Sequence, residues 1–331
     1  MKRKRFIPIP IQGLDTSGPS TLIDSRSTPN CSDVRVSYTH IKKIEGDRQI
    51  GSAISGVVQK IVEFDRESSK YLVRISPTTF EVWTDGSQAW ADKTGTALQG
   101  KYIQPVSAAQ SVISGKGILV FTNYFDSIKK YTVSAGDIEA LGGSPPRCKF
   151  VFPYKGYLTL GYINDSGVVY PYRIQWPDTD DPETWTESDT VNAGHDDLDD
   201  NTDPLAGING LGDLIIPFKS SGIYNGYLTD DTSIFKFDFV ERRLGWLANN
   251  SVKQLPGGKL IGLGNTGLVE YNGISAQLVA TGIMDDIRWN INPQYAQCAF
   301  GEVVEELNEY WLWVPTGSNI YPDLVYRYNY L

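Results

Sequence analysis

The sequence predicts an all-β protein, a β-propeller-like array of about six blades preceded by an extended N-terminal arm. Aromatic residues make up 12% of the 331 residues, and 32 glycines and 18 prolines suit short strands joined by many turns. A pair of apolar strands recurs six times with a mean spacing of about 48 residues, close to the roughly 40–50 residues of a propeller blade. The clearest helical pattern is short, over Thr281–Trp289, and Pro293 follows it.

The six copies align on one leucine in the first strand of each pair. These leucines are Leu72, Leu119, Leu158, Leu214, Leu260 and Leu312. The blades are therefore expected at residues 56–95, 101–141, 147–190, 205–245, 251–290 and 296–331.

Residues 1–50 differ from the repeats and are expected to form an arm, whereas residues 51–331 form the propeller. The last strand, Leu324–Leu331, either pairs with the first blade or leaves the arm to complete the ring. Trp83, Trp311 and Trp313 alternate within strands, and we expect them to fill the interfaces between blades.

Charge and composition exclude several classes of function. The net charge of −9 and the pI of about 4.9 disfavour tight binding to nucleic acid. Three cysteines, Cys31, Cys148 and Cys298, are odd in number and far apart, which favours a reducing compartment over a disulfide framework. The basic start Met1–Arg5 is followed by prolines instead of a signal-peptide core, and no run approaches the roughly 20 apolar residues of a membrane span. We therefore expect an intracellular product without a membrane anchor.

The segment Asp178–Pro204 is dense in Asp and Glu and contains no Lys or Arg. Such density predicts a solvated loop between blades three and four. Within it, Asp197, Asp199, Asn201 and Asp203 alternate as in an EF-type calcium loop. Because Thr202 stands where that loop needs Gly and Ile208 where it needs Glu, a weak divalent site is disfavoured against a loop that acts through its charge.

Two motifs that could indicate chemistry are better explained by turns. Gly262–Gly267 (GLGNTG) matches a dinucleotide fingerprint, but Leu268–Tyr271 and an Asn-Gly turn follow where a helix would be required, which predicts a hairpin. Thr179, Asp181 and Trp185 resemble the Asp-box turn of sialidase-type propellers in a single, shortened copy. A carbohydrate-binding or sialidase-like propeller is therefore the alternative function.

No catalytic constellation is predicted. The two histidines, His40 and His195, have no nucleophile at a recognisable offset, and the sequence contains no P-loop, G-x-S-x-G, H-E-x-x-H or C-x-x-C. We expect no enzymatic role, no cofactor and no metal site.

One stretch resembles a known family. Tyr172–Trp185 (YRIQWPDTDDPETW) is similar to an R-V-x-W-S-…-D-P-x-x-W segment of propeller-like tail proteins of bacteriophages. The matching residues are Arg173, Trp176, Asp181, Pro182 and Trp185, whereas Pro177 departs from the usual Ser. Weaker phrases occur in the family's order, among them Gly143–Pro146, Asp213–Phe218, Gly245–Ser251, Gly264–Gly273 and Tyr310–Val314.

The resemblance implies a structural subunit of the tail of a short-tailed phage, of the nozzle or hub type. Such subunits form a ring, typically of six copies, around the channel through which the genome leaves. The implied partners are further copies of the chain, other tail and adaptor proteins, and DNA in transient passage. The implied location is the virion tail, after synthesis in the host cytoplasm.

A channel for DNA would give the acidic segment a physical role. DNA carries one negative charge per about 1.7 Å of helix axis, so carboxylates that face the channel would repel its phosphates and ease its passage. The candidate lining or gate residues are Asp178, Asp180, Asp181, Glu183, Asp196, Asp197, Asp199, Asp200 and Asp203. The basic Met1–Arg5 is expected to latch onto an acidic neighbour.

Overall fold

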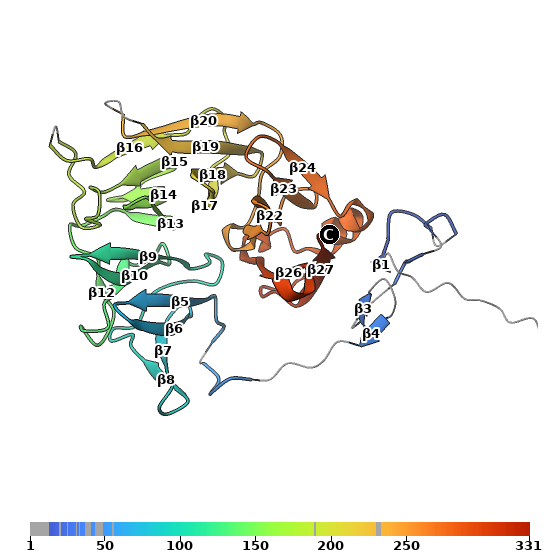
Figure 1. The fold of residues 1–331 in the computed structure, drawn as a ribbon, viewed down its shortest axis with the longest axis horizontal. Helices are drawn as coiled ribbons and strands as arrows, with labels where there is room; N and C mark the ends of the chain where they lie inside the picture. Colours follow the sequence, from blue (N-terminus) through green and yellow to red (C-terminus); the bar gives the residue numbers. More distant parts are fainter. Residues whose placement is uncertain are drawn as a thin grey trace, which may run out of the picture.

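Six antiparallel sheets follow one another around a common axis and form a six-bladed β-propeller (Figure 1). The computed structural model describes residues 13–331 except 20, 25, 31, 33, 37–40, 44–48, 55, 189 and 230–232. Each sheet is built from one continuous stretch of chain, in the predicted order and close to the predicted bounds. The predicted fold class is confirmed.

The first three blades have four strands each. Their strands are β5 (Lys60–Arg66), β6 (Ser69–Ile75), β7 (Phe80–Thr84) and β8 (Ala89–Asp92) in blade one; β9 (Ser107–Ile113), β10 (Lys116–Thr122), β11 (Lys129–Tyr131) and β12 (Glu139–Ala140) in blade two; and β13 (Arg147–Tyr154), β14 (Tyr157–Asp165), β15 (Val168–Trp176) and β16 (Gly194–Asp197) in blade three.

Blades four and five also have four strands, and blade six has three. Their strands are β17 (Leu205–Leu211), β18 (Leu214–Lys219), β19 (Gly222–Leu228) and β20 (Phe235–Glu241) in blade four; β21 (Lys253–Leu255), β22 (Lys259–Leu263), β23 (Leu268–Tyr271) and β24 (Ala276–Val279) in blade five; and β25 (Phe300–Val304), β26 (Glu309–Val314) and β27 (Leu324–Asn329) in blade six.

The first strand of each blade lies nearest the axis, since β5 lies next to β9, β9 next to β13 and β13 next to β17. Neighbouring strands in every blade run antiparallel. Consequently the connection into each blade and the connection from its second to its third strand lie on the same face of the propeller. We call this the upper face, and the opposite one the lower face.

Buried apolar side chains fill five boundaries between blades. Phe64 and Val73 of blade one pack with Leu119 and Phe121 of blade two, and equivalent clusters join blades two to three, three to four, four to five and five to six. Within the described residues, no such cluster joins blade six to blade one. The last boundary is therefore built differently from the other five.

The faces on either side of that last boundary carry exposed apolar groups. On blade six, Phe300 stacks on Trp313 and is 40% exposed, and Trp311 lies beside Trp313. On blade one, Ile61 is 60% exposed, and Trp83 packs on a neighbouring tryptophan of the same face. The prediction that Trp83, Trp311 and Trp313 fill buried interfaces is wrong, because the apolar clusters use the opposite faces of these two sheets.

Loops join the two ends of the propeller. Among the described residues β27 pairs with β26 alone, so the prediction that it pairs with the first blade is wrong. Instead, bonds reach across the axis: the ammonium of Lys60 in blade one donates to Asn250 Oδ1, in the connection into blade five, at 3.0 Å. Gln297 Nε2, in the connection into blade six, donates to the carbonyl of Ile103, in the connection into blade two, at 3.1 Å.

The described parts of the arm add no strand to any blade. They form two small sheets, in which β1 (Gly13–Leu14) pairs with β2 (Ser27–Thr28) and β3 (Val34–Val36) pairs with β4 (Ile41–Lys43). The prediction of an arm that completes the ring is therefore not met by these residues. Met1–Arg5, Cys31 and His40 lie outside the described residues.

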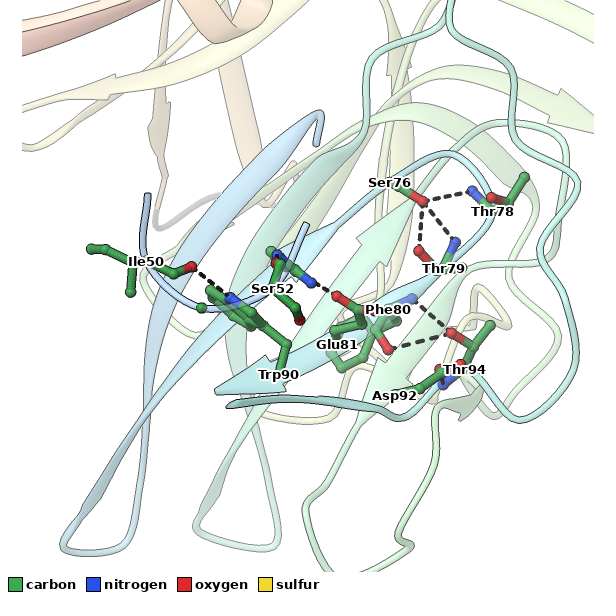
Figure 2. Close-up of polar contacts among 12 residues, drawn as sticks. Ile50, Ser52, Ser76, Thr78, Thr79, Phe80, Glu81, Trp90, Asp92 and Thr94 are labelled. Carbon is green, nitrogen blue, oxygen red and sulfur yellow. Dashed lines mark hydrogen bonds and ion pairs between the residues drawn. The ribbon is translucent and has the colours of Figure 1, made fainter. Parts of the chain in front are cut away.

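The described residues of the arm touch the propeller near blade five and on blade one. Thr16 donates its backbone N–H to the carbonyl of Gly282 at 2.8 Å, between blades five and six. On blade one, Trp90 Nε1 donates to the carbonyl of Ile50 at 3.3 Å, as Figure 2 shows. Arg74, which is buried and paired with Glu81, donates to the carbonyl of Ser52 at 2.8 Å. The segment that leads into the propeller thus lies against the side of blade one.

Two local predictions are confirmed. The predicted helix appears as a 3₁₀ turn, η2 (Thr281–Ile283), followed by α1 (Met284–Asn290). Gly262–Gly267 lies in the hairpin between β22 and β23, with Gly264 N–H bonded to Gly267 O at 2.8 Å. Within the described part of the chain, no helix is both long enough and apolar enough to cross a membrane.

Candidate functional site

The segment predicted to be one acidic loop is divided by a strand. Gly194–Asp197 forms β16, the outermost strand of blade three, and pairs with β15 through Arg173 and Asp197. Residues 177–193 therefore connect β15 to the start of β16, and residues 198–204 connect the end of β16 to β17. The prediction of a single solvated loop over Asp178–Pro204 is wrong, because four of its residues, Gly194–Asp197, form the outermost strand of blade three.

The family-like motif forms a tight turn that fastens blade three to blade two. Asp181 accepts hydrogen bonds from the Glu183 N–H at 3.1 Å and from Thr184 Oγ1 at 2.8 Å. Trp185 is buried in the cluster between the two blades, and its Nε1 donates to the Pro182 carbonyl at 2.9 Å. The Asp-Pro-x-x-Trp end of the motif is thus engaged in holding blades two and three together.

Glu183 is the charged link of this turn to blade two. Its Oε1 pairs with the ammonium of Lys130 at 2.8 Å and accepts the Gly142 N–H at 2.8 Å. Burial raises the pKa of Glu183, but Lys130 and the Gly142 N–H outweigh burial and hold it below its usual value. Glu183 is therefore occupied within the chain and is not a free lining charge.

Replacing Asp181 by alanine removes both hydrogen bonds of the turn, and we expect the free energy of unfolding to fall by about 1–2 kcal/mol. The neighbouring Asp180 has a left-handed backbone, with φ of 56°, which alanine tolerates less well than aspartate. The control is therefore the exposed Asp199: Asp199→Ala removes the same charge without the turn contacts and should change stability by less than about 0.5 kcal/mol. Urea denaturation followed by tryptophan fluorescence measures both. Equal effects of the two substitutions would contradict the role given to Asp181.

The second acidic stretch, Leu198–Pro204, is held by a buried lysine. The ammonium of Lys219 donates to Leu198 O at 2.6 Å, Asn201 Oδ1 at 2.7 Å and Asn201 O at 3.1 Å. Ser220 Oγ donates to Asp203 Oδ2 at 2.6 Å, and Ser221 donates to the same oxygen. These hydroxyl groups lower the pKa of Asp203. The stretch is therefore fixed against the turn between β18 and β19.

The same contacts argue against a calcium loop. Asp197 forms a two-pronged ion pair with Arg173, at 2.8 and 2.7 Å, which lowers the pKa of Asp197. Asn201 faces the ammonium of Lys219 and Asp203 faces two hydroxyl groups, so three of the four oxygen-bearing side chains are bound to donors of the protein. No group of three or more His, Cys, Asp or Glu side chains in the described part of the chain is arranged to hold a metal ion.

The predicted lining residues therefore fall into three sets. Asp178, Asp181, Glu183, Asp197 and Asp203 make hydrogen bonds or ion pairs within the chain. Asp196 is half-buried, and burial raises its pKa. Asp180, Asp199 and Asp200 are exposed and form no ion pair with any other described residue. Asp200 also contacts the hydroxyl of Tyr224, so Asp180 and Asp199 are the most free to present charge to a partner.

A hollow with a volume of about 470 Å³ opens on the upper face of the propeller. The connections into blades two, four, five and six contribute Ile103, Pro204, Leu247 and Gln297 to its wall, and strand β13 of blade three contributes Phe150. Because five successive blades supply the wall, the hollow lies on the propeller axis. The acidic stretch ending in Pro204 borders it, since Ser220 both lines the hollow and binds Asp203.

One wall of the hollow is an aromatic cluster around a lysine. The ammonium of Lys149 lies 3.6 Å from the ring centre of Tyr162 and 5.5 Å from that of Tyr124. Both tyrosines have a left-handed backbone, with φ of 71° at Tyr124 and 57° at Tyr162, a conformation that is costly for bulky side chains and clusters at functional sites. Tyr162 also sits at an irregularity in the pairing of β14 with β15. Burial lowers the pKa of Lys149.

These residues were not predicted from the sequence. A lysine in a strand and a tyrosine in a turn carry no local signature, and the left-handed backbone at Tyr124 and Tyr162 follows from the tertiary structure. The nearest usable signal is the Asn-Tyr-Phe-Asp turn at 123–126, where two aromatic residues occupy a connection that is usually polar.

Lys60, in the innermost strand of blade one, is a further half-buried lysine near the axis. Burial is the main cause that lowers the pKa of Lys60 to about 8; Lys253 lowers it further and Glu302 opposes this. An unfolded lysine titrates near pH 10.4. Between about pH 8 and 10.4 the unfolded chain therefore binds more protons than the folded one, so the contribution of Lys60 to stability rises with pH.

This sign gives a pH-dependent prediction for Lys60→Met. The free energy of unfolding of the variant, relative to wild type, is expected to be highest near pH 7 and to fall by about 2–3 kcal/mol by pH 10. Urea denaturation of both proteins at the two pH values measures this difference, with the exposed Lys236→Met as control. A difference that stays constant with pH would rule out the buried ammonium.

Comparisons with known proteins identify no family for this chain. No family model and no curated protein matches it. Among solved structures, it is similar to the extracellular domain of a protein assigned as a hybrid two-component system of B. thetaiotaomicron, at 11% identity over 88% of this chain and 36% of that one, with a TM-score of 0.47. It is also similar to the Pan2 WD40 domain of Neurospora crassa, at 10% identity over 77% and 71%, with a TM-score of 0.45. The β-propeller domain of Cps50 (Swd1) from Myceliophteria thermophila has a TM-score of 0.44, at 10% identity over 84% and 87%.

The chain spans about a third of the length of the bacterial extracellular domains that it matches, between 31% and 36%.

Proposed function

We propose that this propeller is a structural subunit of the tail of a short-tailed phage, of the nozzle or hub type, without an enzymatic role. The observation that carries the proposal is the ordered series of family-like sequence segments, with Tyr172–Trp185 as the most specific. In the structure the first part of this segment lies in β15, and its last part, up to Trp185, forms the turn that joins blades two and three. A motif devoted to architecture suits a protein whose task is mechanical.

The proposal includes a ring, typically of six copies, in the virion tail, with tail and adaptor proteins as neighbours and DNA passing through. The exposed Asp180, Asp199 and Asp200 are the carboxylates available to repel the DNA phosphates. Synthesis would take place in the host cytoplasm, and the free thiols of Cys148 and Cys298 are consistent with a reducing compartment.

Light scattering on the purified protein, alone and with the other tail components, tests the ring. A closed ring of six has a mass of about 220 kDa, six times the 36.8 kDa of one chain. Cryo-electron microscopy of that ring then locates the exposed carboxylates, which are expected to face the channel. A protein that remains a single chain with every tail component, or a ring with these carboxylates on its outer surface, would overturn the corresponding part of the proposal.

A further inference from the structure

We propose that the hollow on the propeller axis binds a small organic anion, with Lys149 paired to its charged group and Phe125 and Phe150 against its apolar body. This inference does not depend on the role in a phage tail. It rests on the shape of the hollow, the charges on its wall and the backbone conformations that build it.

The size and composition of the hollow suit a small organic molecule. Its volume of about 470 Å³ falls within the roughly 300–1,000 Å³ of ligand sites. The wall combines apolar side chains with a few polar ones, the usual composition of such sites. The apolar side chains include Phe125, Phe150, Leu205 and Leu247. The polar side chains include Gln104, Asn249, Asn250 and Gln297.

The charge on the wall selects an anion. Lys149 is the charged residue of the wall, and no Asp or Glu of the described chain lines the hollow. No carboxylate within the described residues forms an ion pair with Lys149; its ammonium is held instead by the faces of Tyr162 and Tyr124. A half-buried ammonium without a counter-charge costs free energy, and an anionic ligand would supply that charge. The positive charge of this wall contrasts with the net charge of −9 of the whole chain.

A left-handed backbone at two tyrosines orients the side chains of this wall. Tyr124 and Tyr162 adopt φ of 71° and 57°, and their rings meet edge to face at 5.8 Å. Tyr162 is a positioning residue that holds Lys149, whereas Phe125, adjacent to Tyr124, lines the hollow itself. Strain of this kind persists where the surrounding structure gains from the resulting geometry.

The rim limits the ligand to a small molecule. The exposed Asp199 and Asp200 belong to the stretch that borders the hollow and ends in Pro204. These carboxylates would repel an extended polyanion such as DNA, whereas a single anionic group can reach Lys149 inside. The site is therefore distinct from any nucleic-acid surface.

A matched pair of fluorescent probes tests the site on the full chain. One is 8-anilino-1-naphthalenesulfonate, and the other is N-phenyl-1-naphthylamine, which has the same rings without the anionic group. The wild type is expected to bind one sulfonate probe per chain, more tightly than the neutral one. Equal affinity for the two probes, or binding without saturation, would overturn the proposal without any variant.

Two substitutions separate charge from apolar contact. Lys149→Met is expected to weaken the sulfonate probe about 10- to 100-fold, the value of a charged hydrogen bond, and to leave the neutral probe unchanged. Phe125→Ala is expected to weaken both probes about 10-fold, because it removes apolar contact area. Lys155→Met, at an exposed lysine in the turn between β13 and β14, is the matched control and should change neither.

Lys149→Gln provides a second neutral variant if the methionine form does not fold, and circular dichroism verifies the fold of each protein. Sulfonate affinity that is unchanged in a folded Lys149 variant would exclude the hollow as an anion site.

Discussion

Replacing Trp185 by alanine is expected to lower the free energy of unfolding by about 3–5 kcal/mol, the usual cost of removing a large aromatic side chain from a core. Trp185 is 8% exposed and packs among the apolar side chains of blades two and three. The substitution also removes the hydrogen bond from its Nε1 to the Pro182 carbonyl. Urea denaturation followed by circular dichroism measures the loss.

Trp289 supplies the matched control. It lies on α1 and is 82% exposed, so Trp289→Ala removes the same side chain with an expected change below about 0.5 kcal/mol. If Trp185→Ala cost no more than Trp289→Ala, the family-like motif would not be an architectural element. The mechanical explanation of its sequence would then be lost as well.

Replacing Lys219 by methionine is expected to lower the free energy of unfolding by about 2–4 kcal/mol. The substitution keeps most of the unbranched side chain but removes the ammonium, which leaves three oxygen acceptors, on Leu198 and Asn201, without that donor. Each unpaired buried acceptor costs about 1–3 kcal/mol, and relief from burying the ammonium offsets part of this sum. Burial lowers the pKa of Lys219, in agreement with that offset.

A structural readout distinguishes this role from a general loss of stability. Hydrogen exchange is expected to accelerate first in residues 198–203, because Lys219 fixes this stretch to blade four. Lys236→Met, in the exposed part of the same blade, should leave both stability and exchange unchanged. Uniform acceleration along the chain in Lys219→Met would contradict the local anchoring.

The sequence was sufficient for the fold because the repeat is a property of local patterning. Each blade is a contiguous stretch of alternating apolar strands and turns, so the spacing of Leu72 through Leu312 predicts both the number of blades and their bounds. The turn at Gly262–Gly267 was predictable for the same reason, since its hairpin depends on adjacent residues.

The candidate sites could not be predicted in this way. The acidic segment reads as a loop because charge density outweighs the weak strand signal of Gly194–Asp197, whose pairing with β15 depends on residues some twenty positions earlier. The contacts of Lys219 with Leu198 and of Lys149 with Tyr162 are likewise set by packing between strands. Trp311 and Trp313 alternate as expected, but alternation does not reveal which face of a sheet is covered.

The boundary between the last and the first blade is the weakest boundary of the propeller. Buried apolar side chains join neighbouring sheets at five places around the axis, whereas the described residues of blades six and one share no such cluster. Polar bonds across the axis hold the ends of the chain of blades instead, from Lys60 of blade one to Asn250 in the connection into blade five, and from Gln297 in the connection into blade six to Ile103 in the connection into blade two. Because no apolar cluster of the described residues spans the boundary between blades six and one, we expect the propeller to open there at a lower cost than between any other two blades, with every sheet intact. A propeller with one weakly packed boundary can change the spacing of its blades around the axis without unfolding any of them.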